Sequence, residues 1–141
     1  MMASTTRQRS FRLPPSTLDL LDGRARETGE SGNQVAGRLL AEGLRTDAHA
    51  LIRFRDVGDG TRQPALGGHR LLVADVIASV RANDSDAELT ARSLGVSVDK
   101  VRAAIRYYAE HRAEIDVEIR RAQEAFEREA ERHRREHEAL A

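Results

Sequence analysis

Residues 7–14 read RQRSFRLP and alternate polar with apolar side chains until two prolines interrupt the pattern. Successive side chains of a β-strand point to opposite faces, so Phe11 and Leu13 share one face. The opposite face carries the polar side chains of Gln8, Ser10 and Arg12. This alternation predicts a short strand over residues 6–13. A single strand of this length is not stable in water, so it needs a second strand as a partner.

Two amphipathic helices are expected directly after this strand. The first begins with Ser16 or Thr17 as its N-cap and ends at Gly29, because glycine readily adopts the left-handed conformation that closes a helix. The second begins at Ser31, which forms a capping box with Gln34. Apolar residues recur at helical spacing in both, namely Leu18, Leu21, Ala25, Val35, Leu39, Leu40 and Leu44. A unit of about 45 residues buries too little surface to be stable alone, so we expect residues 1–46 to form a homodimer.

Composition restricts the class of protein. The chain has 141 residues, no cysteine and a formal net charge of zero. The absence of cysteine excludes a disulfide-stapled secreted fold. The first residues do not contain the apolar run of a signal peptide, and no window is apolar enough to span a membrane. We therefore expect a cytoplasmic protein without membrane contact.

The order of strand, helix and helix over residues 6–45 resembles the ribbon-helix-helix family of Arc, MetJ and CopG type repressors. The matching segments are SFRLP, STLDLLDGRARETG and ESGNQVAGRLLAEGL. In that family, strands from two chains form a ribbon that enters the major groove of DNA. The resemblance implies that Gln8, Ser10 and Arg12 read bases, which suits their hydrogen-bonding groups. The alternative is an edge strand whose polar residues only face solvent.

The same resemblance implies a set of contacts to DNA phosphates. A helix N-terminus has free amides and a favourable dipole for an anion, and Gly32 allows the backbone to approach a phosphate closely. The phosphate contacts that we assign are Arg7, Arg9, Ser31, Gly32 and Asn33. The alternative is that Ser31 only caps the helix and Asn33 is solvated.

The middle of the chain predicts a small second domain. Residues 47–70 are expected to contain one or two short strands with glycine-rich turns, and residues 71–117 three helices. The predicted caps are Ser85 with Glu88, Gly95 and Ser97, and the predicted core is Leu89, Leu94, Val96, Val101 and Ile105. The last two helices have helix-turn-helix spacing, but acidic residues dilute the positive charge of the second. Residues 51–117 also resemble a domain of VapB-type antitoxins, although GGHRLLV departs from that family's usual turn.

The sequence predicts a long, highly charged helix that starts near Glu114, and residues 118–141 form its tail. Antitoxins similar to this chain carry a carboxy-terminal segment that embraces a toxin, and the resemblance implies a PIN-like ribonuclease as that partner. The anchors that we assign to the toxin contact are Ile115, Ile119, Phe126 and Leu140. The alternative is a solvated helical extension or a weak coiled coil.

Neither catalysis nor a cofactor is expected. His133 and His137 stand four residues apart, but two ligands without a third nearby make a weak metal site, so no metal is assigned. The carboxylates are dispersed over charged helices and suggest no catalytic set. The sequence thus predicts a mainly α protein with a dimeric ribbon-helix-helix unit, a hairpin with a trihelical domain, and a charged tail. The expected function is an antitoxin that represses its own operon by binding operator DNA; the alternative is a repressor without a toxin partner.

Overall fold

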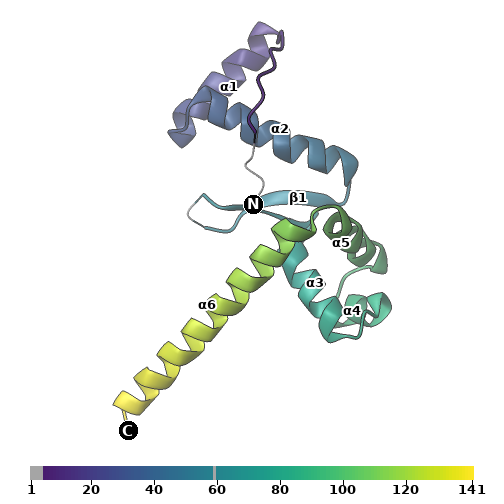
Figure 1. Cartoon of the computed structure of the whole chain (residues 1–141), viewed down its shortest axis with the longest axis vertical. Coiled ribbons are helices and arrows are strands. Elements are labelled where there is room, and N and C mark those ends of the chain that lie inside the picture. Colours follow the sequence, from purple (N-terminus) through teal and green to yellow (C-terminus); the bar gives the residue numbers. More distant parts are fainter. Residues whose placement is uncertain (1–4, 59) are drawn as a thin grey trace. The chain divides into compact units, whose positions relative to one another are not determined.

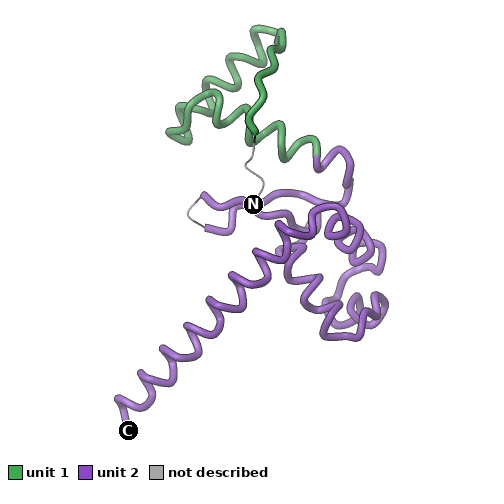
Figure 2. The backbone as a smooth tube through the Cα atoms, in the orientation of Figure 1, with its two compact units in different colours: residues 1–44 green, residues 45–141 purple. Residues whose placement is uncertain are grey.

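Figure 1 shows the computed structural model of the chain, which describes residues 5–58 and 60–141. The described residues form six helices and one two-stranded antiparallel sheet, so the expected mainly α class is confirmed. The chain divides into two compact units, residues 1–44 and residues 45–141 (Figure 2). None of the helices in the described ranges is long and apolar enough to cross a membrane.

The first unit contains α1 (Pro15–Thr28) and most of α2 (Gly32–Ala48). The N-cap of α1 is Pro14, not Ser16 or Thr17, and Pro15 occupies the first helical position, where the missing amide costs nothing. The helix ends as predicted at Gly29, which has φ 72°. The predicted capping box is also present. The Ser31 amide donates to Gln34 Oε1 at 2.9 Å, and the Gln34 amide donates to Ser31 Oγ at 3.1 Å.

The strand predicted over residues 6–13 is absent from the single chain. Residues 5–14 have no regular secondary structure, and all of their side chains are exposed. The physical reason is that a strand needs backbone partners, and the sheet in this chain pairs only the two strands of the second unit. Pairing with a second copy stays a prediction.

The second unit begins with the predicted hairpin. Strands β1 (Ile52–Asp56) and β2 (Arg62–Leu66) pair antiparallel, with Ile52 opposite Leu66 and Asp56 opposite Arg62. Four helices follow, namely α3 (Val73–Ala82), α4 (Ala87–Leu94), α5 (Val98–Glu110) and α6 (Arg112–Ala139). The predictions of a three-helix segment and of a long charged terminal helix are therefore confirmed.

The caps of these helices agree with the sequence except at α4. Gly95 closes α4 with φ 70°, and Ser97 Oγ accepts the Lys100 amide at the start of α5 at 3.4 Å. The predicted capping box of Ser85 with Glu88 is wrong. Asp86 caps α4 by accepting the Leu89 amide at 2.9 Å. Ser85 has φ 64°, the left-handed region, whereas an N-cap has an extended backbone.

One apolar core holds the second unit together. Its buried side chains come from the hairpin, α3, α4, α5 and the first turn of α6 and include Ile52, Leu66, Val73, Val76, Ile77, Val101, Tyr107 and Ile115. Of the predicted core, Val101 is fully buried, and Leu94, Val96 and Ile105 pack against it in part. Leu89 was wrongly placed in the core, since it is 39% exposed and Thr90 and Ala91 are the buried residues of α4.

Candidate functional site

An apolar groove lies open on the first unit. Its lining residues are Phe11, Leu13, Thr17, Leu20, Leu21, Arg24, Ala36, Leu39 and Leu40. Leu20 is 76% exposed and Phe11 63% exposed, whereas Val35 is the one fully buried residue among the described residues of this unit. Contiguous exposed apolar surface of this kind marks an interaction site. Phe11 and Leu13, which the sequence predicted to face a core, border this groove.

The residues assigned to DNA bases lie on the exposed segment that precedes α1. Gln8, Ser10 and Arg12 are all exposed, and none has a hydrogen bond or ion pair to the described part of the chain. The same holds for Arg7 and Arg9. Three guanidinium groups without acidic neighbours in the same segment give it a positive charge, which favours contact with a polyanion.

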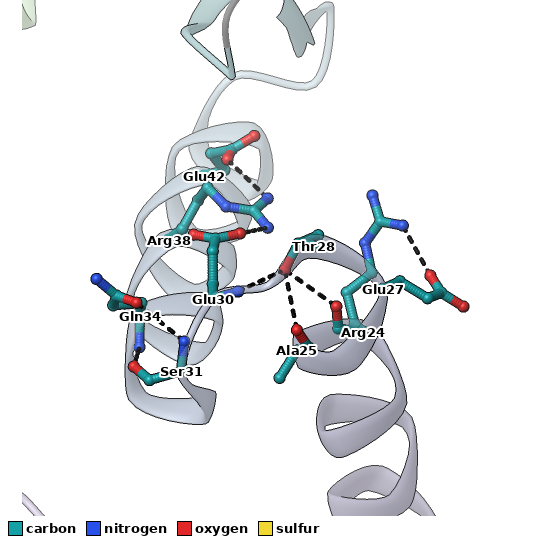
Figure 3. Close-up of polar contacts among 9 residues, drawn as sticks. All are labelled: Arg24, Ala25, Glu27, Thr28, Glu30, Ser31, Gln34, Arg38 and Glu42. Carbon is teal, nitrogen blue, oxygen red and sulfur yellow. Dashed lines mark hydrogen bonds and ion pairs between the residues drawn. The ribbon is translucent and has the colours of Figure 1, made fainter.

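The start of α2 is less open to an anion than the sequence indicated. The Ser31 amide is not free, because it donates to the Gln34 side chain (Figure 3). The amides of Gly32 and Asn33 have no acceptor in the described part of the chain. Arg38 pairs with Glu30 at 3.1 Å beside this helix start. We therefore remove the Ser31 amide from the phosphate contacts and keep its hydroxyl in the role of a cap.

The cations of α5 are largely engaged within the second unit. Lys100 Nζ donates to the Gly67 carbonyl at 3.0 Å, and Arg102 pairs with Glu88 at 2.9 Å. Arg112, just after α5, lies over the Tyr108 ring at 5.5 Å from its centroid. These partners compete with phosphates for the same side chains. Arg106 of α5 is exposed and has no partner among the described residues, so DNA contact by the helix-turn-helix segment stays a prediction.

A polar cluster that the sequence did not predict lies beside the core of the second unit. Arg45 Nη1 donates to Tyr107 Oη at 3.1 Å and to both carboxylate oxygens of Glu114 at 2.9 Å. The Arg45 guanidinium also lies 5.4 Å from the centre of the Phe54 ring. Burial raises the pKa of Tyr107 to about 12, so the phenol is neutral and donates or accepts only as a hydroxyl. This cluster ties the end of α2 to α5 and α6.

Glu118 adds a titratable carboxyl to the same cluster. Burial, followed by the negative charge of Glu114, raises the pKa of Glu118 to about 7. Its Oε2 atom is buried and has no hydrogen-bond partner among the described residues. No local pattern links Arg45 with Glu114, because they are 69 positions apart along the chain, and Glu118 is farther still. Only the tertiary fold brings these groups together.

The predicted toxin anchors have two different environments. Ile115 is fully buried in the core of the second unit and Ile119 packs against that core in part, so Ile115 is not available to a partner. Phe126 is 75% exposed and Leu140 is 88% exposed. From Arg120 to Ala141 every side chain is exposed except that of Glu131, which is half-buried. The surface that α6 offers to a partner thus begins after Ile119.

Charge pairs cover most of this exposed part of α6. Arg135 pairs with Glu131 at 3.2 Å, and Arg134 pairs with the same carboxylate. Exposed pairs of this kind contribute about 0–1 kcal/mol each. Of the two adjacent tyrosines, Tyr107 is fully buried, whereas Tyr108 is half-buried and donates to Asp116 Oδ1 at 2.7 Å.

Comparison of the chain with protein-family models, with curated proteins and with solved structures finds no match. The features that bear on function are therefore the groove of the first unit, the basic segment before α1 that contains Arg7, Arg9 and Arg12, and the exposed part of α6.

Proposed function

We propose that the chain is the antitoxin of a type II toxin-antitoxin pair, which binds operator DNA as a dimer and neutralises a PIN-like ribonuclease toxin. The observation that carries the proposal is the open groove of the first unit. The apolar lining of this groove is not covered in a single chain. The segment before α1 contributes Phe11 and Leu13 to the groove, and the same segment contains the alternating basic and polar residues. A second copy covers the groove and provides the partner strand in a single step.

The paired strands then present one polar face to DNA. Arg12 binds guanine with two hydrogen bonds, Gln8 binds adenine in the same way, and Ser10 accepts or donates. Arg7, Arg9 and the free amides of Gly32 and Asn33 contact phosphates, which fixes the register of the protein on the duplex. All of these residues except the half-buried Gly32 are exposed in the single chain, which supports this assignment.

The exposed part of α6 is the proposed toxin contact. Phe126 supplies the largest exposed apolar side chain of this helix, and Leu140 supplies a second anchor near its end. Aromatic anchors usually contribute more to binding than exposed charges do. Basic side chains such as Arg128 and Arg132 are suited to the acidic metal site of a nuclease. No catalytic role is assigned to this chain.

One observation favours the alternative, a ribbon-helix-helix repressor without a toxin. Because Ile115 is in the core and Ile119 packs against it, the large apolar anchors left on the exposed part of α6 are Phe126 and Leu140. Fourteen residues of helix place them about 21 Å apart. Two separated anchors make a sparse interface for a protein partner.

The test of DNA reading is selection from random duplexes by the purified protein. The variant with Gln8, Ser10 and Arg12 all changed to Ala is expected to lose sequence selection and keep weak, salt-dependent binding. The control changes Arg26 and Thr28 to Ala; both are exposed residues of α1 that do not line the groove. Unchanged selection by the first variant would refute the assignment of these residues to bases.

The test of neutralisation uses the nuclease encoded next to this chain, in co-purification and growth-rescue assays. A chain that ends after Arg121 keeps Ile115 and Ile119 in place and removes the exposed part of α6. We expect this truncated chain to bind operator DNA but to fail in rescue. Rescue equal to that of the full chain would place the toxin contact elsewhere, and failure of the full chain to bind any such nuclease would leave the repressor alternative.

A further inference from the structure

Three metal-ligating side chains meet at one edge of the second unit. His49 follows the last residue of α2, Glu110 is the last residue of α5, and His111 joins α5 to α6. One ligand atom from each lies within 4.8 Å of the other two. His49 Nε2 is 2.8 Å from Glu110 Oε2. The fold thus gathers two imidazoles and a carboxylate from segments about 60 residues apart.

The backbone holds these residues in defined positions. The His49 amide donates to the Arg45 carbonyl at 2.9 Å, and the His49 carbonyl accepts the Ile52 amide at 2.9 Å. The His111 amide donates to the Tyr107 carbonyl at 3.0 Å. The Tyr107 ring lies 5.1 Å from the His49 ring and 4.5 Å from the His111 ring, centre to centre. Both imidazoles therefore pack against one buried aromatic side chain.

We propose that His49, Glu110 and His111 bind a divalent transition-metal ion of the zinc class. Two imidazole nitrogens and one carboxylate oxygen form a donor set typical of Zn²⁺ and of Co²⁺ or Ni²⁺, whereas Mg²⁺ and Ca²⁺ prefer oxygen ligands alone. His49 is 7% exposed and Glu110 is exposed. The site therefore has a buried wall on one side and an open side on which water completes the coordination.

The distances fit such an ion after small side-chain movements. Ligand atoms at about 2.0–2.1 Å from a tetrahedral Zn²⁺ are about 3.4 Å apart from one another. To bind one ion, the ligand atoms of His49 and Glu110, which are now hydrogen-bonded, move slightly apart. The wider separations between ligand atoms, up to 4.8 Å, shorten when the exposed Glu110 and the half-buried His111 side chains rotate.

Binding would join the segment that follows α2 to the junction of α5 and α6. An ion that binds the folded state and not the unfolded chain raises the melting temperature in a concentration-dependent way. This role is independent of DNA or toxin binding. The rival site is the pair of His133 and His137 on α6, which offers only two ligands; the His133 side chain is 83% exposed.

The experiment uses the full chain without a histidine tag, freed of metal by a chelator. Zn²⁺ is titrated by calorimetry, Co²⁺ by visible absorption, and melting is followed with and without Zn²⁺. We expect one ion per chain, intense Co²⁺ absorption of the tetrahedral type and a raised melting temperature. Because loss of an outer-shell partner alone costs about 10–100-fold in metal affinity, His111→Gln and Glu110→Gln should each weaken binding at least that much.

The matched control is the double change His133→Gln with His137→Gln, which should leave the affinity for Zn²⁺ unchanged. Melting of each variant without metal checks that the second unit is folded. Glu110 is exposed and His111 half-buried, so a folded variant is expected in both cases. The proposal is overturned if the full chain binds neither ion at one equivalent, or if the control loses binding and His111→Gln retains it.

Discussion

The two units of this chain differ in how much of their apolar surface they bury. The second unit encloses a core in which Ile52, Val101, Tyr107 and Ile115 are fully buried. The first unit has Val35 as its one fully buried side chain in the described range, while five of its leucines line an open groove. Similar helical patterns in the sequence therefore give a closed apolar core in the second unit and an open apolar groove in the first. The proposed dimer rests on this open groove.

The largest expected effect concerns the groove of the first unit. Replacing Leu20 by Ala removes two leucines from each dimer, at about 2 kcal/mol each, which corresponds to about thousand-fold weaker self-association. Sedimentation equilibrium of the full chain measures this change. The control is Leu140→Ala on α6, a residue that is also strongly exposed. Equal self-association of the Leu20→Ala protein and the wild type would show that the groove is not the dimer contact.

The second expected effect concerns the core of the second unit. Ile115→Ala should lower the free energy of unfolding by about 3 kcal/mol, because it removes a fully buried side chain and leaves a cavity. Phe126→Ala on the same helix should change it by less than about 0.5 kcal/mol, because Phe126 is mostly exposed. Urea denaturation measures both. Similar losses for the two variants would contradict the boundary that we draw after Ile119.

The third expected effect concerns the basic segment of the first unit. Arg12→Ala should cost about 1–3 kcal/mol in binding to the preferred operator and reduce discrimination between sequences. Fluorescence anisotropy at fixed salt measures the affinity for matched and mismatched duplexes. Arg92→Ala on α4 removes the same charge from the second unit and should leave both affinities nearly unchanged. Equal discrimination by Arg12→Ala and wild type would argue that this arginine contacts only phosphates.

The smallest expected effect is a pH dependence confined to the second unit. Because the folded state raises the pKa of Glu118 from about 4.5 to about 7, it binds the proton more tightly than the unfolded chain does. The stabilising contribution is therefore complete below about pH 4.5 and is lost as the pH rises through about 7. Solvent screening at this half-buried carboxyl reduces the expected loss to about 1 kcal/mol.

Glu118→Gln should remove this dependence, since an amide does not titrate. Urea denaturation at several pH values between 5 and 8.5 compares the variant with the wild type. Glu124→Gln, an exposed residue of the same helix, is the control and should titrate like the wild type. A wild-type profile that stays parallel to that of Glu118→Gln would show that Glu118 is not a buried acid in solution.

Local sequence signals determined the helices, most of their caps and the hairpin. The capping box of Ser31 with Gln34, the helix ends at Gly29 and Gly95, and the short strands expected within residues 47–70 all depend on neighbours within a few positions. Such interactions are decided by backbone conformation and side-chain reach, so they can be read along the chain. The same reasoning predicted the charged character of α6, whereas the polar face expected over residues 8–12 depends on a strand that the single chain does not form.

The tertiary structure alone decided which side chains are buried and which distant groups meet. Leu89 and Ile115 look alike in a helical pattern, but one faces solvent and the other lies in the core, because burial depends on where α4 and α6 contact the other helices. The contacts of Arg45 with Glu114 and of His49 with Glu110 join residues more than 60 positions apart. No local pattern encodes such pairs, since the packing of the whole unit determines their distances.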